Sequence, residues 1–79
     1  MVVLGDISAA RLLYQRAAAL GSAQAATAIG NTYDAAFLTS IRASGIVADR
    51  TAAAAWYRKG AAMGDREATD RLARLSQAQ

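Results

Sequence analysis

The chain has no cysteine, no histidine and no proline among its 79 residues. Without cysteine it can form no disulfide and offers no thiolate to a metal. Without histidine it lacks the commonest metal ligand and the usual general base near neutral pH. A glycine-rich phosphate loop and carboxylates paired on one helix face are missing too, and the serines, threonines and aspartates are better explained as helix caps. We therefore expect no enzyme, no metal and no cofactor.

Long hydrophobic runs are also missing. The apolar start, Met1 to Leu4, ends at Gly5 and is too short for the core of a signal peptide or for a membrane span. The sequence thus predicts no membrane span and leaves the compartment undetermined. The two alternatives are the cytoplasm and, if further sequence precedes this start, the periplasm.

Acidic residues are fewer than basic ones, six against nine, which gives a net charge of +3. This balance, mostly due to arginine, favours acidic partners mildly. The arginines are spread along the chain and interleaved with acids toward the C-terminus, as on a solvated helix surface. Because there is also no exposed aromatic platform, we expect no nucleic-acid partner.

Alanine, by contrast, makes up more than a quarter of the chain, and it is the best helix former. The chain also repeats itself, because residues 6–29 match residues 49–72 at a constant offset of 43. Tyr14 falls on Tyr57 at that offset, and Gly21 falls on Gly64. A period between about 20 and 50 residues indicates stacked repeats, none of which can bury its apolar face alone.

Capping residues divide the two copies into helices. Ser22, Asp49 and Asp65 can each accept from free amides of a first helical turn, and Gly21 and Gly64 can take the left-handed conformation that ends a helix. Two-residue links predict antiparallel hairpins. The expected helices cover about 6–20, 22–33, 49–63 and 65–76.

The stretch 34–43 has no counterpart in the second copy. Either Asp34 caps a separate short helix at about 35–42, or the preceding helix continues through it; we favour the break. Gly30 lies inside a helix, where it costs about 1 kcal/mol relative to alanine. We interpret it as a point of close helix approach.

Apolar spacing predicts which faces pack together. In the first helix, Leu13 and Tyr14 belong to the inward face with Ala10, Ala17 and Ala18. Arg11 and Gln15 fall on the opposite, solvent-facing side. The last helix carries three oppositely charged pairs four residues apart, which suggests a solvent-facing helix that ends an array. These pairs are Arg66–Asp70, Glu67–Arg71 and Asp70–Arg74.

The second copy carries a recognisable motif, which resembles the Sel-one-like repeat, a cousin of the tetratricopeptide repeat. Residues 6–33 match as a diverged first copy with Leu13-Tyr14 in place of Trp-Tyr. Gly60 departs from the family's alanine, and the spacer between copies is longer than usual. The matching residues are Gly45-Ile46-Val47, Asp49, Ala52-Ala53, Trp56-Tyr57, Arg58-Lys59, Ala61-Ala62, Gly64, Ala68 and Leu72.

The resemblance implies an all-α fold, an α/α superhelix or solenoid of two antiparallel hairpins. It places one domain over residues 1–79, with repeat one at about 6–44 and repeat two at about 45–79, as part of a longer array. Family members are typically scaffolds or adaptors in bacterial and eukaryotic signalling. The residues expected to pack the helices are Leu13, Tyr14, Gly21, Tyr33, Trp56, Tyr57, Gly64 and Leu72.

By the same resemblance, the chain is a protein-interaction module that binds a protein or peptide on its concave surface. Its candidate partner-binding residues are Arg11, Gln15, Arg58 and Lys59, which suit an acidic segment. The alternative is the capping end of a longer repeat protein, with a structural role or self-association through the open N-terminal end. We expect recognition to depend on what the copies do not share, the arginine-bearing faces and residues 34–43.

Overall fold

The computed structural model describes residues 7–42 and 45–77, which form five α-helices and no strand. The expected all-helical chain is confirmed, and each expected boundary lies within about two residues of the observed one. Asp6, where the first helix was expected to begin, lies outside the described residues. The helices are α1 (Ile7–Ala19), α2 (Ala23–Tyr33), α3 (Ala35–Ser40), α4 (Arg50–Ala62) and α5 (Arg66–Gln77).

Polar caps begin the helices as the sequence predicts. Ser22 Oγ accepts a hydrogen bond from the Ala25 amide at 3.1 Å, and Asp49 Oδ1 accepts one from the Ala52 amide at 3.1 Å. Both satisfy amides that have no partner inside their own helix.

The break at Asp34 is confirmed as well. Its backbone is extended, with φ −88° and ψ 118°, so it ends α2 and caps α3 at once. Asp34 Oδ1 accepts from the Ala36 amide at 2.9 Å. One residue thereby redirects the chain, and α3 becomes a separate short helix.

The two helical hairpins share one turn geometry. Gly21 and Gly64 have φ of 103° and 102°. A residue with a side chain would be strained at these values. In each turn the residue after the glycine donates across the helix end at 3.0 Å, Ser22 to Ala17 and Asp65 to Gly60. This bonding pattern is that of a Schellman motif, so the repetition seen in the sequence is also a repetition of structure.

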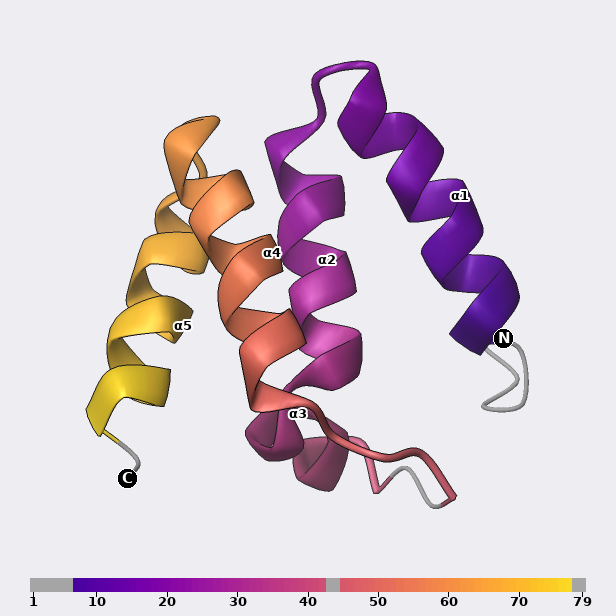
Figure 1. Ribbon diagram of the computed structural model, residues 1–79, viewed down its shortest axis with the longest axis vertical. Coiled ribbons are helices and arrows are strands. Elements are labelled where there is room, and N and C mark those ends of the chain that lie inside the picture. Colours follow the sequence, from indigo (N-terminus) through magenta and orange to yellow (C-terminus); the bar gives the residue numbers. More distant parts are fainter. Residues whose placement is uncertain (1–6, 43–44, 78–79) are drawn as a thin grey trace.

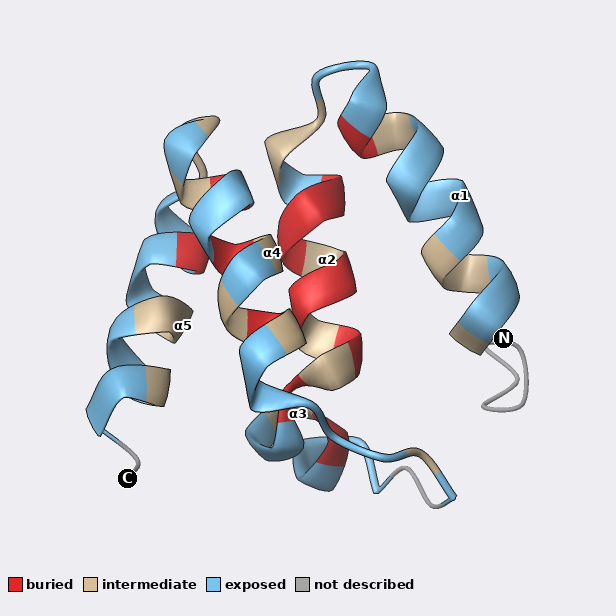
Figure 2. Cartoon of the chain, viewed as in Figure 1, coloured by how far each residue is buried: buried red, intermediate tan, exposed pale blue. Residues whose placement is uncertain are grey.

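The helices lie in the order α1, α2, α4 and α5, with α2 between α1 and α4 (Figure 1). Most of the buried residues are on α2 and on the side of α4 that faces it (Figure 2). α1, by contrast, has a single buried residue, Ala18. The core is therefore centred on the contact between the second helix of repeat one and the first helix of repeat two.

Glycines allow that contact to be close. A Cβ added at Gly30 would lie 2.5 Å from two ring carbons of Tyr57, so the predicted close approach is confirmed. A Cβ at Gly60 would lie 2.6 Å from Thr27 Oγ1. Gly60 thus makes room for Thr27, whose hydroxyl donates to Asp65 Oδ2 and ties α2 to the start of α5.

A buried polar cluster joins α2, α3 and α4. Tyr57 is fully buried, and its hydroxyl donates to Asp34 Oδ2 at 2.7 Å and lies 2.8 Å from Asn31 Oδ1. Burial raises the pKa of Tyr57 far above its ordinary value, and the hydrogen bond to Asp34 raises it further. The neutral phenol is therefore the form that the fold stabilises.

The charge pairs expected on the outer helix α5 form only in part. Of the three expected charge pairs, only Glu67–Arg71 forms a salt bridge among the described residues, at 2.8 Å. Ala68 is buried with Ala53 and Tyr57 of α4, and Leu72 and Leu75 pack against this cluster. Because such exposed pairs add only a few tenths of a kcal/mol each, the absence of the other two changes the stability little.

Candidate binding surfaces

Arg11 is not part of an open binding groove. Its Nε donates to Thr32 Oγ1 at 2.8 Å and its Nη2 to the Thr32 carbonyl at 2.9 Å. Its guanidinium carbon lies 3.8 Å from the centre of the Tyr33 ring. The prediction that Arg11 lies on the side of the first helix away from its neighbours is wrong, because its side chain makes cation–π and hydrogen-bonding contacts with α2.

The other three predicted binding residues are exposed and lie on two helices. Gln15 is on α1, whereas Arg58 and Lys59 are neighbours on α4. Lys59 Nζ lies 5.3 Å from the centre of the Trp56 ring, and Arg58 lines a cavity between α4 and α5. The four predicted residues are thus divided between α1 and α4, which have α2 between them (Figure 1).

The packing roles expected of Leu13 and Tyr14 are also wrong. Leu13 is 64% exposed and Tyr14 is 40% exposed. Their counterparts in repeat two are Trp56 and Tyr57. Trp56 packs against the α1–α2 cluster, which consists of Ala18, Ala25 and Ala26, and Tyr57 is fully buried. The cause is geometric: α4 packs between α2 and α5, while α1 packs mainly on α2 among the described helices.

Together these side chains make an apolar face on α1. It consists of Leu12, Leu13 and Tyr14 on α1 and of Leu20, the residue after its end, exposed by 54%, 64%, 40% and 89%. Several large apolar side chains exposed on one short segment of a small protein suggest an interaction site more strongly than single scattered ones do. This set is called the α1 face below.

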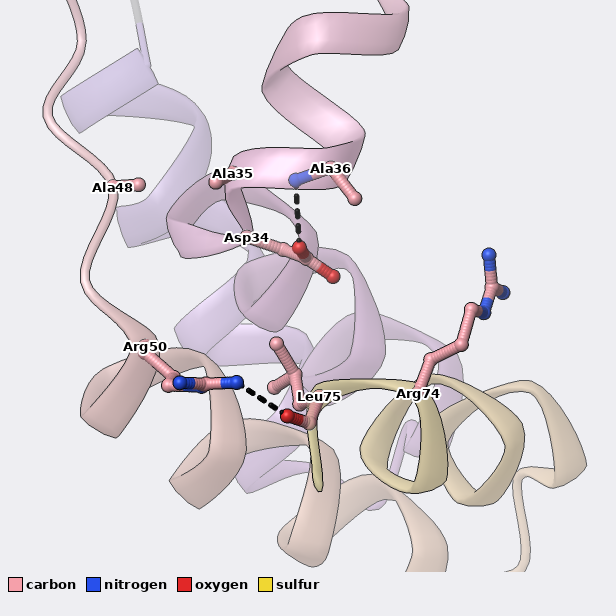
Figure 3. A pocket seen from close by; sticks show the side chains of 7 residues that line it. All are labelled: Asp34, Ala35, Ala36, Ala48, Arg50, Arg74 and Leu75. Atoms are coloured by element: carbon pink, nitrogen blue, oxygen red, sulfur yellow. Dashed lines mark hydrogen bonds between the residues drawn. The ribbon is translucent and has the colours of Figure 1, made fainter. Parts of the chain in front are cut away.

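A separate cavity of about 370 Å³ opens beside the start of α3 (Figure 3). The guanidinium of Arg50 reaches across its edge and donates to the Leu75 carbonyl at 2.6 Å, whereas Arg74 points away from the other labelled side chains. The sequence did not single out this cavity by residue, but it lies at the predicted stretch 34–43. This cavity is called the insertion cavity below. It is lined by Asp34, Ala35, Ala36, Ala48, Arg50, Arg74 and Leu75.

A second cavity of about 250 Å³ adjoins the first, because Arg50 and Leu75 line both. No spacing rule could have shown this neighbourhood, since Arg50 and Leu75 are 25 residues apart and meet only when α4 and α5 pack. This α4–α5 cavity is lined by Arg50, Thr51, Ala54, Arg58, Leu72, Leu75 and Ser76.

Within residues 7–42 and 45–77, no three acidic, cysteine or histidine side chains lie close enough to hold a metal ion. None of the helices in these ranges has the length and apolar character needed to cross a membrane. No family model matches the chain, and comparisons with curated proteins and with solved structures give no significant match. The Sel-one-like resemblance therefore stays a prediction.

Proposed function

We propose that the chain is a non-enzymatic interaction module of two Sel-one-like repeats, stacked as part of an α/α solenoid. The matched glycine turns of the two hairpins support this assignment. Two further features, the lack of cysteine and histidine and the use of the polar side chains as caps, favour binding over catalysis. Gln15, Arg58 and Lys59 remain candidates for partner contacts, and Arg11 is withdrawn.

The α1 face carries the proposal. Its residues Leu13 and Tyr14 stand at the positions of Trp56 and Tyr57, which in repeat two lie against a helix. In repeat one, Leu13 is 64% exposed and Tyr14 is 40% exposed. A face whose copy elsewhere in the molecule is buried by a helix is suited to bind a helix.

The covering helix α2 shows what such a partner needs. At Gly30 it has no side chain, which leaves room for the Tyr57 ring. Asn31, the next residue, and Asp34, one turn further on, meet the Tyr57 hydroxyl. A partner for Tyr14 should therefore be an amphipathic helix with glycine opposite the ring and a hydrogen-bond acceptor beyond it.

A stapled helical peptide with the sequence of residues 22–34 tests the proposal. Titrated into the ¹⁵N-labelled protein, it should shift the amides of Leu12, Leu13 and Tyr14. The same peptide with Gly30→Leu is the matched control, because the added side chain would collide with the tyrosine ring. Shifts absent from α1, or equal binding of the two peptides, would refute this mode of binding.

Self-association through the α1 face is the second candidate, since apolar side chains of two copies could cover each other. Head-to-tail stacking on α5 is disfavoured, because Ala73 stands 43 residues after Gly30 and would crowd the tyrosine ring. Light scattering across a concentration series separates the candidates. A dimer that Leu13→Glu dissociates supports self-association, whereas a monomer at every concentration excludes it.

A further inference from the structure

The insertion cavity lies where the two repeats differ. One wall is the start of α3, which has no counterpart in repeat two. The opposite wall is the last turn of α5, and the Ala48 loop before α4 closes a third side. It is separate from the α1 face, since no residue of α1 lines it.

Positive charge dominates both cavities. Their linings contain three arginines, Arg50, Arg58 and Arg74, and a single described acid, Asp34. Hydrogen bonds from the Ala36 amide and the Tyr57 hydroxyl already engage that carboxylate. Guanidinium groups bind carboxylates well, often through two parallel hydrogen bonds.

Arg50 is held in place for such a role. Its Nη2 donates to the Leu75 carbonyl at 2.6 Å, and a guanidinium has further N–H donors to offer. Because this bond fixes the side chain, binding an anion there costs less side-chain entropy than ordering a free arginine.

The insertion cavity is apolar between these charges. Ala35, Ala36 and Ala48 have short side chains that leave space, and Leu75 adds an aliphatic wall. The volume of about 370 Å³ lies within the range of roughly 300–1,000 Å³ typical of ligand pockets. An aliphatic side chain fits this combination of shape and polarity.

The α4–α5 cavity extends the site beyond one side chain. Arg50 and Leu75 line the boundary between the two cavities, so a chain that crosses their hydrogen bond reaches both. In an extended segment, residues two apart point to the same side and can enter successive cavities. No aromatic side chain lines either cavity, so neither offers a surface on which nucleic-acid bases stack.

From these features we propose that the two cavities bind an extended acidic segment of a partner protein. Two aliphatic side chains of that segment, two residues apart, enter the insertion cavity and the α4–α5 cavity. Carboxylates two residues before and after them, on the same side of the segment, pair with Arg50, Arg58 and Arg74. The proposal does not depend on what the α1 face binds.

The probe is a short fluorescent peptide of sequence Glu-Thr-Leu-Thr-Leu-Thr-Glu, in which leucine and glutamate share one side of the extended chain. It is titrated by anisotropy and by NMR. Amide shifts should cluster at Ala35, Ala36, Arg50 and Leu75 and leave α1 unchanged. Peptides with lysine for glutamate, or serine for leucine, should each bind at least about tenfold more weakly, which corresponds to about 1.4 kcal/mol.

Matched variants locate the site on the protein. Arg74→Glu should weaken binding about tenfold or more, whereas Arg66→Glu, the same charge change at the other end of α5, should weaken it about twofold or less. Ala36→Leu should block binding by filling the insertion cavity. Ala36 is exposed, so this variant should keep the circular dichroism spectrum and melting temperature of the parent.

Several outcomes would overturn the proposal. One is that the leucine–glutamate peptide does not bind, and another is that Arg74→Glu and Arg66→Glu lose equal affinity. The others are amide shifts confined to α1 and an affinity that stays the same when serine replaces leucine in the peptide. If decanoate, a small aliphatic carboxylate, saturates the cavities while the peptide does not bind, the assignment to a protein segment is wrong.

Discussion

The helices α1 and α4 carry related sequences at a fixed offset, yet they are buried to different extents. Tyr57 on α4 is fully buried, while Tyr14 on α1 is 40% exposed. Both helices begin a hairpin, and both hairpins turn at a glycine with φ near 100°. The difference comes from their neighbours, because α4 packs extensively on α2 and α1 has α2 on one side only.

This comparison separates what a repeat encodes from what its surroundings supply. The repeated residues encode helix, turn and a face able to pack, whereas burial requires a second helix on the other side. Equivalent substitutions in the two copies should therefore have unequal effects on stability.

The tyrosine pair should show the largest inequality. Tyr57→Ala removes a buried ring and its hydrogen bonds, and should lower the free energy of unfolding by ~3–5 kcal/mol. Tyr14→Ala should cost under ~1 kcal/mol, as exposed substitutions do. Urea melts followed by circular dichroism measure both, and equal losses would mean that the copies do not differ in packing.

The Trp56 and Leu13 pair comes next. Trp56 packs against the α1–α2 cluster but is only partly buried, so Trp56→Ala should cost about 2–3 kcal/mol, less than a fully buried aromatic. Leu13→Ala should change the stability by about 0.5 kcal/mol or less. A Trp56→Ala variant that melts with its parent would contradict the packing role of this side chain.

Gly30 and Ala73 occupy equivalent positions, 43 residues apart, but substitutions there should change the stability by different mechanisms. Glycine to alanine inside a helix normally stabilises by about 1 kcal/mol, yet Gly30→Ala should destabilise by about 1–3 kcal/mol because its Cβ meets the Tyr57 ring. At exposed Ala73 the reverse change, to glycine, should cost about 1 kcal/mol through helix propensity alone. A higher melting temperature for Gly30→Ala would rule out the close contact.

The smallest effect concerns alkaline pH. The pKa of Tyr57 is raised in the fold, so above the ordinary tyrosine pKa of about 10 the unfolded chain loses a proton that the folded chain keeps. That contribution to stability is complete below pH ~10 and is lost as the pH rises further. Tyr57→Phe should show a shallower decline between pH ~10 and ~12, and parallel curves would argue against the raised pKa.

The helices were predictable because their signals are local. Ser22, Asp34 and Asp49 cap within three residues of themselves, so sequence spacing was enough to place them. Gly30 was also correctly assigned to a close approach, although its contact, Tyr57, could not be named from the pattern.

The α1 surfaces were not predictable in the same way. Spacing placed Leu13 inside and Arg11 outside, whereas Leu13 is exposed and Arg11 binds Thr32 and stacks on Tyr33. Where a helix has two faces that could pack, the neighbouring helices decide which face is buried. The periodicity of the helix's own sequence does not show where those neighbours lie. The insertion cavity was missed at residue level for a related reason, since its walls meet only through tertiary packing.

An extended chain tests most directly whether a covering helix accounts for the difference between the copies. A second copy of residues 6–48 placed ahead of Asp6 would put an α2 equivalent before α1, as α2 precedes α4. In that chain, Tyr14→Ala in the downstream copy should cost about 3 kcal/mol or more in a urea melt, instead of under ~1 kcal/mol in the natural chain. A loss that stays under ~1 kcal/mol in both chains would contradict the account.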